Sequence, residues 1–276
     1  STVAGHAARR SNNSDRLNSM RNETIWRPTK YVQCSGRWRT SLDTKEVGVG
    51  SRLISDAVAK CYDEHLTSCA RGRLLDLGCG KAPLYGIYRS LVTNVTCCDW
   101  ADDAHVDVVS DLAQPLPFAD GAFDTIILSD VLEHAPDPAL VWREMSRVLA
   151  PGGHIVMNVP FFYWLHAHPH DFYRFTEFAL ARFSTVNGLK LLHLEPLGGV
   201  VEVWTDLHAK LLARIPLASS PVAAQLQIVP GLWGRCRYRN HIAKVSARPL
   251  PLGHFVIAQK TDRLCCYTVP CPIILR

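Results

Sequence analysis

The sequence of 276 residues has no segment that would place it among membrane or repeat proteins. No window contains the uninterrupted apolar run of about 18 residues that a transmembrane helix needs. The nearest stretch, from Leu211 to Trp233, is interrupted by Arg214 and by three prolines. Internal repeats are also absent, and the first forty residues lack the apolar core of a signal peptide. We therefore expect a cytoplasmic protein without a transmembrane segment, for which peripheral contact with a membrane stays open.

Zinc-type cysteine spacing is missing too. The chain has ten cysteines but no pair of CxxC motifs. Cys79, Cys97 and Cys98 lie within apolar segments that we predict to be buried. Scattered cysteines of this kind indicate reduced thiols rather than a disulfide framework, which agrees with a cytoplasmic location.

Acidic residues are absent from one long basic segment. No Asp or Glu lies between Asp206 and Asp262, a span that holds eight Lys and Arg, and residues 1–40 hold eight more against Asp15 and Glu23. The net charge is +5. Basic segments of this kind are typical of a solvated surface, or of one that faces an anionic substrate or membrane. The second interpretation favours a substrate that is phosphorylated or lipid-linked.

Apolar segments of strand length alternate with helical segments in the middle of the chain. The predicted strands are 73–77, 95–98, 105–109, 123–128, 154–159, 189–194 and 254–259. The predicted helices are 51–70, 83–91, 138–149 and 176–186. Near-continuous apolar strands between helices are typical of a parallel sheet covered on both faces. We predict an α/β fold with a Rossmann-like, doubly wound, mostly parallel seven-stranded sheet.

We expect three parts along the chain. Residues 1–45 form a basic, partly flexible N-terminal arm, residues 46–260 form the α/β domain, and residues 261–276 form a C-terminal tail. Within the domain, residues 200–252 are predicted to be a helical insertion before the last strand that covers the substrate.

The turn after the first predicted strand, Gly78-Cys79-Gly80, indicates which cofactor the sheet binds. A phosphate-binding P-loop is excluded because Ala82 stands where Ser or Thr must follow Lys81. A dinucleotide fingerprint is disfavoured because Pro83 occupies its third small position. The remaining candidate is S-adenosylmethionine, which has no pyrophosphate and therefore needs fewer glycines.

Five segments follow one another in the order and at the spacing of a known family. They are LLDLGCG at 74–80, Asp99 after the second strand, SDL at 110–112, FDTIILSDVLEH at 123–134 and RVLAPGG at 147–153. In these segments the sequence resembles the class I S-adenosylmethionine-dependent methyltransferases and is similar to their type-11 (UbiE-like) subgroup. The resemblance covers roughly residues 70–195 and departs from the family at Ala82, where many members carry a third glycine.

The residues themselves support part of a cofactor site. Gly78 and Gly80 let the backbone approach a ligand closely, and Asp99 is spaced to accept hydrogen bonds from both ribose hydroxyls. Trp100 is placed to cover the adenine face. The resemblance implies further contacts for the adenine and methionine parts. The predicted cofactor-binding residues are Asp76, Gly78, Cys79, Gly80, Asp99, Trp100, Asp111, Leu112 and Ser129.

The resemblance implies roles for four of these residues. It implies that Asp111 contacts the adenine amino group and Leu112 the adenine ring, and that Ser129 lines the methionine part. It also implies that Asp76 holds the ammonium group.

An aromatic, histidine-rich loop from Pro160 to Phe175 follows the fifth predicted strand. Loops at this edge of a sheet carry function more often than packing. By resemblance the loop closes over the methyl acceptor, and His166 is our predicted general base, oriented by Asp171. Asp171 has an alternative role, a structural ion pair with Arg174 that pins the loop. His134 is a second predicted catalytic residue.

The predicted substrate-binding residues all come from this loop. They are Tyr163, His168, His170, Tyr173 and Arg174. Histidines 166, 168 and 170 would share one face of an extended segment, but we predict no metal because a carboxylate set for one is not evident. Glu133 is interpreted as a first-turn charge favoured by the helix dipole.

The predicted reaction is O-methylation of a small molecule, by in-line displacement at a hydroxyl of a sugar, glycoconjugate or natural product. The alternatives are N- or C-methylation of a lipid-like or quinone-like acceptor, methylation of nucleic acid, and a non-catalytic regulator that binds S-adenosylmethionine. The chain reads Ser129-Asp130-Val131-Leu132 where amino-directed base methyltransferases carry Asn/Asp-Pro-Pro-Tyr, which argues against nucleic acid. The oligomeric state is not predicted.

Overall fold

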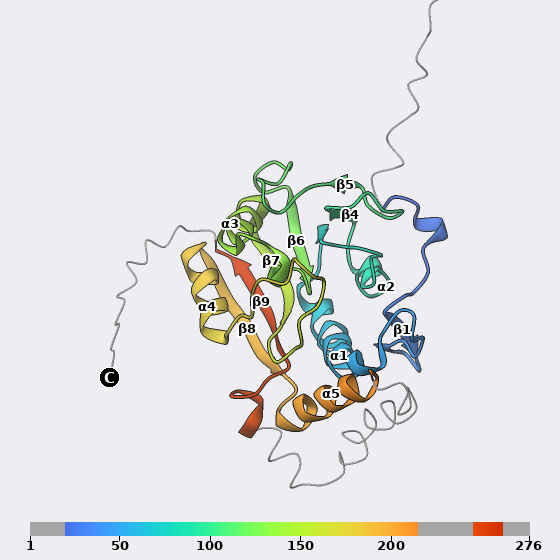
Figure 1. Ribbon diagram of the computed structural model, residues 1–276. Helices are drawn as coiled ribbons and strands as arrows, with labels where there is room; N and C mark the ends of the chain where they lie inside the picture. Colours follow the sequence, from blue (N-terminus) through green and yellow to red (C-terminus); the bar gives the residue numbers. More distant parts are fainter. Residues whose placement is uncertain (1–19, 215–244, 262–276) are drawn as a thin grey trace, which may run out of the picture.

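The computed structural model describes residues 20–214 and 245–261 (Figure 1). The strands are β1 (Tyr31–Cys34), β2 (Arg37–Thr40), β3 (Arg73–Leu77), β4 (Asn94–Asp99), β5 (Val108–Val109), β6 (Phe123–Ser129), β7 (Leu149–Pro160), β8 (Leu189–Leu197) and β9 (Gly253–Lys260). The α-helices are α1 (Arg52–Cys69), α2 (Tyr85–Tyr88), α3 (Pro138–Val148), α4 (Glu177–Val186) and α5 (Val200–Leu212). Four 3-10 helices are η1 (Glu23–Ile25), η2 (Val49–Ser51), η3 (Arg89–Leu91) and η4 (Leu132–His134).

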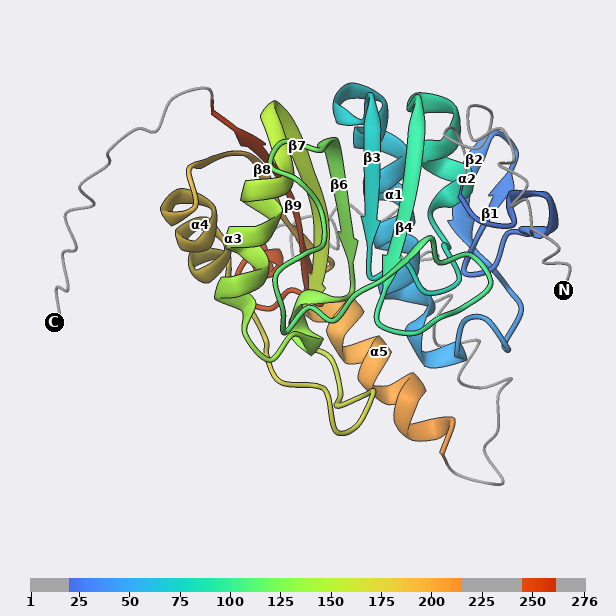
Figure 2. The same cartoon turned by 90° about the horizontal axis from the view of Figure 1, so that it is seen from above.

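A seven-stranded sheet in the order β5-β4-β3-β6-β7-β9-β8 forms the centre of the molecule (Figure 2). Its strands run parallel except for β9, which is antiparallel to both β7 and β8. The predicted Rossmann-like, mostly parallel sheet is confirmed. The chain runs outward from β3 through β4 to β5 and then returns to β6 beside β3. Ligands of such sheets bind where the strand order reverses, at the carboxyl ends of the strands.

Both faces of the sheet are buried, because successive strand residues contribute to two separate cores. Leu74 of β3 belongs to the core under α1 and α2, whereas Leu75 belongs to the core under α3 and α4. Ile127 and Ile126 of β6 divide in the same way. This explains the near-continuous apolar runs from which the strands are predictable.

Two predicted elements are shorter in the structure than in the sequence pattern. The segment at 105–109 pairs only at Val108–Val109, because Val106 N–H closes a turn onto the Asp103 carbonyl. The helix predicted over 83–91 divides into α2 and the 3-10 helix η3. The β1–β2 hairpin and the bounds of α5 are not evident from the sequence periodicity.

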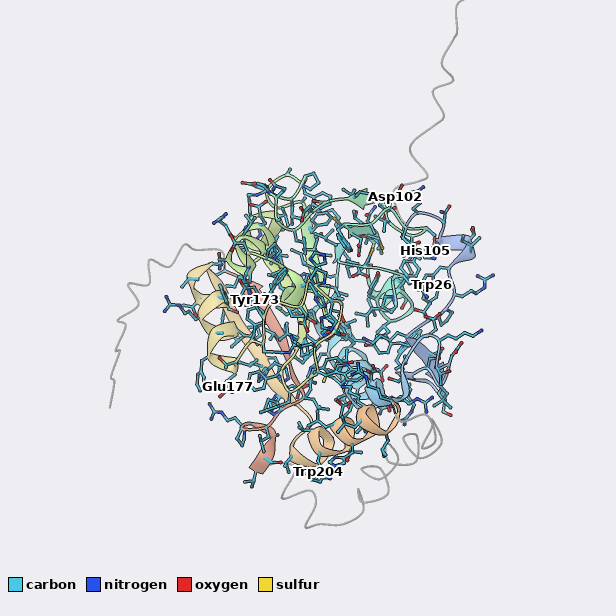
Figure 3. All side chains as sticks on the ribbon, viewed as in Figure 1. Trp26, Asp102, His105, Tyr173, Glu177 and Trp204 are labelled. Carbon is cyan, nitrogen blue, oxygen red and sulfur yellow. The ribbon has the colours of Figure 1, made fainter. Side chains whose placement is uncertain are left out.

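The segment before α1 lies against the α/β domain. The Trp26 indole Nε1–H donates to the Ala82 carbonyl at 3.1 Å, and its ring lies 5.2 Å from the Tyr85 ring of α2 (Figure 3). The ring of Trp38 fills the space where a Cβ at Gly86 would stand. Residues 20–45 therefore pack on the domain, and residues 1–19 lie outside the described residues. The boundary at 45/46 stays a prediction.

Other sequence predictions fall partly outside the described residues. Of the insertion at 200–252, α5 and residues 245–252 are described, and residues 215–244 are not. The tail from residue 262 onward is also outside. Cys34, Cys61, Cys69, Cys79, Cys97 and Cys98 are free thiols. No helix within residues 20–214 and 245–261 is both long and apolar enough to cross a membrane.

A buried ion pair docks α5 on the domain. Asp206 and Lys210, one turn apart on α5, are bonded to each other with 0% and 2% of their side chains exposed. The Lys210 ammonium lies 3.4 Å from the centre of the Tyr163 ring, and the Tyr163 hydroxyl is hydrogen-bonded to Ser51 at 2.6 Å. Burial raises the pKa of Asp206 to about 6 and lowers that of Lys210. The pair therefore links α5 to a loop residue that we predict to contact substrate.

We predict that Asp206→Ala destabilises the protein by about 3–5 kcal/mol, because it leaves a buried ammonium without its partner. The double variant Asp206→Leu/Lys210→Met should recover most of this loss, since it removes both charges. Glu64→Ala, which breaks the exposed Lys60–Glu64 pair of the same spacing, is the matched control and should cost less than about 0.5 kcal/mol. Urea unfolding measures all three. Equal stability of Asp206→Ala and the parent protein would contradict the prediction.

Candidate active site

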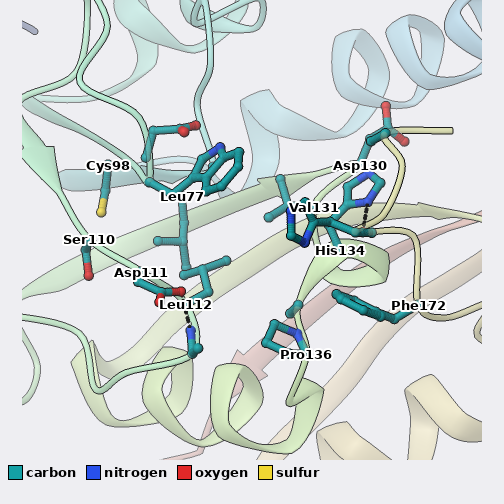
Figure 4. A pocket seen from close by; sticks show the side chains of 17 residues that line it. Leu77, Cys98, Ser110, Asp111, Leu112, Asp130, Val131, His134, Pro136 and Phe172 are labelled. Atoms are coloured by element: carbon teal, nitrogen blue, oxygen red, sulfur yellow. Dashed lines mark hydrogen bonds between the residues drawn. The ribbon is translucent and has the colours of Figure 1, made fainter.

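A cavity of about 600 Å³ opens at the carboxyl ends of β3, β4 and β6 (Figure 4). Its volume is within the range of small-molecule sites, about 300–1,000 Å³. The lining residues are Leu77, Gly78, Cys98, Asp99, Trp100, Ser110, Asp111, Leu112, Ala113, Asp130, Val131, His134, Ala135, Pro136, Ala167, His170 and Phe172. The cavity therefore lies at the point where the strand order reverses.

Charged and apolar groups both line this cavity. Asp99 is the last residue of β4 and Asp111 follows β5. Leu112, Val131 and Phe172 contribute apolar surface (Figure 4). Two carboxylates beside an apolar wall are the groups that a nucleoside needs for its hydroxyl and amino donors and its flat base. The lining thus fits an adenosyl group.

The glycine turn is fixed to the end of β4. Gly78 N–H donates to the Cys98 carbonyl at 2.7 Å, and Gly80 N–H donates to Oδ2 of Asp99 at 2.8 Å. Gly78 has a φ of +75°, and a Cβ there would clash with the Val131 side chain. Only glycine satisfies both requirements at this position. The turn and the Asp99 carboxylate are therefore one preorganised unit.

Some predicted cofactor residues are not among the lining residues of this cavity. Asp76, Cys79, Gly80 and Ser129 are absent from the lining, whereas Gly78, Asp99, Trp100, Asp111 and Leu112 are in it. Asp76 is 3% exposed, and its Oδ2 accepts a hydrogen bond from the Tyr88 hydroxyl at 2.7 Å. Burial raises its pKa to about 7 in spite of this bond.

A second cavity, of about 310 Å³, adjoins the first. Its lining residues are Lys30, Glu46, Val47, Gly48, Ser51, Ile54, Ser55, Asp130, Glu133, His134, Pro160, Tyr163 and His166. Asp130 and His134 line both cavities. The two cavities therefore meet at these two residues.

Asp130 is a site residue that sequence reasoning misses. It follows β6 with a φ of +53°, and its carboxylate binds Lys30 Nζ at 2.8 Å and accepts from Asn158 Nδ2 at 2.6 Å. The side-chain oxygen Oδ1 of Asn158 in turn accepts from the Tyr62 hydroxyl at 3.1 Å. The position of Asp130 could have indicated it as a site residue, since it directly follows β6 and the cavity opens at the carboxyl end of that strand.

Glu133, His134 and His166 form a cluster at the second cavity. Oε1 of Glu133 lies 3.7 Å from Nε2 of His134 and 3.9 Å from Nε2 of His166. Glu133 lies in the first turn of η4, but it is 0% exposed, and neither carboxylate oxygen has a hydrogen-bond partner in the structure. Burial, and then the charge of Asp130, raise its pKa well above the usual range. Its inward orientation was not predicted, because η4 is separate from the following helix α3.

The hydrogen bond to the His170 carbonyl determines the tautomer of the neutral His134 ring. Its Nδ1 lies 2.7 Å from the His170 carbonyl (Figure 4). A carbonyl oxygen only accepts, so Nδ1 carries the proton when the ring is neutral, and Nε2 is then the free acceptor. His134 is therefore equipped to accept a proton at the junction of the two cavities.

Asp171 contacts both residues with which the sequence analysis pairs it, Arg174 and His166. Arg174 donates to its two oxygens at 2.6 and 2.8 Å, and the backbone N–H of His166 donates to Oδ2 at 3.0 Å. Nδ1 of the His166 ring lies 3.2 Å from the same oxygen. The bonds from Arg174 hold the pKa of Asp171 well below its usual range. Burial lowers the pKa of His166, so its ring is neutral at neutral pH.

Two of the five predicted substrate-binding residues line a cavity, and the other three do not. Tyr163 lines the second cavity, and His170 lines the first, where its ring lies 5.7 Å from that of Trp100. His168, Tyr173 and Arg174 line neither cavity. His168 is exposed, so the predicted face of three histidines does not form. The absence of a metal stays a prediction, because ligand atoms of Glu133, His134 and His166 lie within 4.8 Å of one another.

Comparison with known proteins identifies the domain. A family model described as a methyltransferase domain (Methyltransf_11) matches residues 75–157, which run from β3 into β7. Residues 75–157 are therefore similar to the methyltransferase domains of type 11, in agreement with the resemblance that the sequence motifs carry.

The curated relatives match part of the chain. A ubiquinone biosynthesis O-methyltransferase of Xanthomonas euvesicatoria pv. vesicatoria is 33% identical over 106 residues, which cover 32% of this chain and 43% of the relative. A protein of the same name from Xanthomonas campestris pv. campestris is 32% identical over 103 residues, 31% of this chain and 42% of the relative. The chain thus aligns with less than half the length of these relatives.

Solved structures resemble the chain more distantly. The [4+2]-cyclase SpnF has 18% identity and a TM-score of 0.49 over 85% of this chain and 87% of its own. An S-adenosylmethionine-dependent methyltransferase from Mesorhizobium loti has 16% identity and a TM-score of 0.48 over 74% of this chain and 98% of its own.

We predict that Asp76→Asn changes how stability depends on pH. The folded carboxyl of Asp76 holds its proton up to about pH 7, whereas the unfolded one loses it near 3.8, so this group lowers folding stability progressively as pH rises through that window. The amide cannot ionise. Relative to the parent protein, Asp76→Asn should gain stability from acid toward neutral pH, by up to about 4 kcal/mol.

Urea unfolding of the cofactor-free protein at several pH values measures this difference. Asp103→Asn, an exposed aspartate in the loop after β4, is the control and should follow the parent protein. A constant difference between Asp76→Asn and the parent would show that folding does not raise the pKa of Asp76.

Proposed function

We propose that the chain is a methyltransferase that moves a methyl group from S-adenosylmethionine to a hydroxyl oxygen of a small molecule. The observation that carries the proposal is the meeting of two cavities at Asp130 and His134. One cavity offers the carboxylates and apolar wall for a nucleoside. The other contains imidazoles that can accept a proton.

The first cavity would hold the cofactor. Asp99 would accept hydrogen bonds from the ribose hydroxyls, Asp111 from the adenine amino group, and Leu112, Val131 and Phe172 would contact the adenine ring. Trp100, which is 71% exposed beside His170, would cover the cavity mouth. The positive φ at Gly78 and the bond from Gly80 to Asp99 support this assignment, because they fix the backbone for close approach. Asp76, Cys79 and Ser129 would act behind the lining.

His166 is the proposed general base. S-adenosylmethionine supplies a methyl carbon bonded to a positively charged sulfur, which makes that carbon an electrophile. A hydroxyl that attacks it must give up a proton. His166 lines the acceptor cavity, and its lowered pKa keeps the ring neutral and ready to take that proton. The Asp171 carboxylate, 3.2 Å from Nδ1, would stabilise the resulting imidazolium.

His134 is the second candidate for the base. Its bond to the His170 carbonyl leaves Nε2 as the acceptor, and it lines both cavities. The ring of His134 lies 4.8 Å from that of His166, so the two candidates serve the same space. Variants of each separate them.

The second cavity supports an acceptor with an apolar body. Val47, Ile54, Pro160 and the Tyr163 ring contribute apolar surface, and Lys30 adds a positive charge at one side. The names of the curated relatives describe O-methyltransferases of ubiquinone biosynthesis, which favours oxygen over nitrogen or carbon and a phenolic ring as the acceptor. Hydroxyls of sugars and of natural products are the competing acceptors.

The direct test is transfer of labelled methyl from S-adenosylmethionine to a panel of catechols, quinols, sugars and nucleic acid, with mass analysis of products. The expected result is a methyl ether on a phenol and no label on nucleic acid. Binding of S-adenosylmethionine without turnover on any acceptor, including a cell extract, would favour the non-catalytic regulator. Failure to bind S-adenosylmethionine would reject the proposal.

We predict that Asp99→Ala weakens binding of S-adenosylmethionine by about 10- to 150-fold, the loss of hydrogen bonds to a charged group. Calorimetric titration measures the dissociation constant. Asp103→Ala removes an exposed carboxylate four residues away and should leave binding within about twofold of the parent value. Unchanged binding by Asp99→Ala would show that the ribose does not lie against β4.

We predict that His166→Gln lowers kcat by about 10²- to 10⁴-fold, the usual contribution of a general base, and leaves the dissociation constant of S-adenosylmethionine nearly unchanged. In the parent protein, kcat/KM should rise with pH through a midpoint below 6.5, as the imidazole loses its proton, and this limb should vanish in His166→Gln. His105→Gln, outside both cavities, is the control.

His134→Gln is assayed in parallel with these variants. A large loss in His134→Gln together with near-normal activity in His166→Gln would assign the base to His134 instead.

A further inference from the structure

A second cluster of ligating side chains lies outside both cavities, between α1 and β8. It consists of His65 on α1 and His193 and Glu195 on β8, and one ligand atom of each lies within 4.8 Å of the others. None of the three lines either cavity. The methyl-transfer proposal uses none of them.

A register shift in β8 brings its two residues to face α1. Leu191 pairs with Ala258 and His193 with Ile257, so Leu192 is an extra residue at this point of the ladder. Leu191 and Ala258 belong to the core on the α3 and α4 side, whereas Ile257 belongs to the core on the α1 side. The extra residue thus moves His193, and with it Glu195, to the α1 face. Bulges are known to redirect side chains in this way.

The donor atoms converge on one carboxylate. Nε2 of His65 lies 3.7 Å from Oε1 of Glu195, and Nε2 of His193 lies 3.4 Å from Oε2. Donor atoms of a tetrahedral zinc site with bonds of about 2.0–2.1 Å are about 3.3–3.5 Å apart. The two separations, which end on different oxygens of Glu195, are within a few tenths of an ångström of this spacing, and the three ligand atoms taken together lie within 4.8 Å of one another. The two imidazole rings lie side by side, with their centres 4.5 Å apart.

One nitrogen of the cluster makes no hydrogen bond. Nε2 of His193 is buried, and its 3.4 Å contact with Oε2 of Glu195 is not a hydrogen bond. The surroundings are otherwise fixed: the Cys61 thiol donates to Oε1 of Glu195 at 2.9 Å, and the Phe255 ring stacks on His65 at 5.6 Å between centres. A buried imidazole nitrogen that makes no hydrogen bond is available as a metal ligand. The carboxylate beside it already accepts a hydrogen bond from the Cys61 thiol.

We propose that His65, His193 and Glu195 bind a divalent transition-metal ion of the zinc type, which ties α1 to β8. Two imidazoles and one carboxylate are a known zinc ligand set and favour zinc over the oxygen-preferring magnesium and calcium ions. The Cys61 thiol orients the carboxylate from the second shell of groups around the ion. None of the three residues lines either cavity, so the ion would tie α1 to β8 rather than take part in methyl transfer.

The test uses the full chain after treatment with a chelator. Calorimetric titration with zinc chloride should show saturable binding of one ion, and Tm should rise with zinc concentration. Cobalt chloride should give visible absorption bands of a low-symmetry site. His65→Ala and His193→Ala should each weaken zinc binding by at least about 100-fold. Magnesium chloride should have no effect on Tm.

Two controls keep the result specific to this cluster. His208→Ala removes an imidazole on α5 and should bind zinc like the parent protein. In the chelator, the Tm of His193→Ala should stay near the parent value, which shows that the variant folds. Zinc binding that survives both His65→Ala and His193→Ala but is lost in His134→Ala would place the ion in the Glu133–His134–His166 cluster and overturn the proposal. Absence of saturable binding to the parent chain would overturn it as well.

Discussion

The Asp130 carboxylate is the interaction on which the arrangement of the site depends. It binds Lys30 from the segment before β1 and Asn158 from β7, and Asn158 extends the connection to Tyr62 of α1. These three parts of the chain lie far apart in sequence. Because Asp130 lines both cavities, the bonds that join these parts of the chain also fix the residue at which the two cavities meet.

The negative charge of Asp130 has a consequence for the groups around it. It raises the pKa of Glu133, which burial already raises, so the buried carboxyl is kept in its neutral form. A neutral Glu133 adds no negative charge beside the Nε2 atoms of the two neighbouring imidazoles, and burial lowers the pKa of His166 although the Asp171 carboxylate opposes this. Lys30 balances the charge of Asp130 itself. The site thus holds a neutral imidazole next to a paired charge, which is the protonation state that a general base requires at neutral pH.

The sequence predicts the half of the site that is local and fails for the half that is long-range. Gly78 and Asp99 belong to a strand, a turn and the next strand, and backbone requirements within that unit dictate their types. Lys30 reaches the site only because β1 and β2 fold back on the domain, and no periodicity in residues 20–46 predicts that contact. From the sequence, Glu133 is interpreted as an acidic residue in the first turn of a helix. In the structure it lies in the separate 3-10 helix η4, which ends before α3 begins, and its side chain is buried.

The same distinction explains why a cysteine count says little about metal ligands in this chain. Motif reasoning looks for two ligands from one loop, and the CxxC spacing is absent. His193 and Glu195 are two residues apart on a strand, so their side chains share one face of the sheet. Which face that is, and therefore whether a third ligand lies opposite, cannot be predicted from the spacing alone. The extra residue at Leu192 decides that face, because a shift of one residue turns every later side chain of a strand to the other side. The pairing of β8 with β9 therefore determines whether these groups meet α1 and His65, and the paired residues are more than fifty positions apart in sequence.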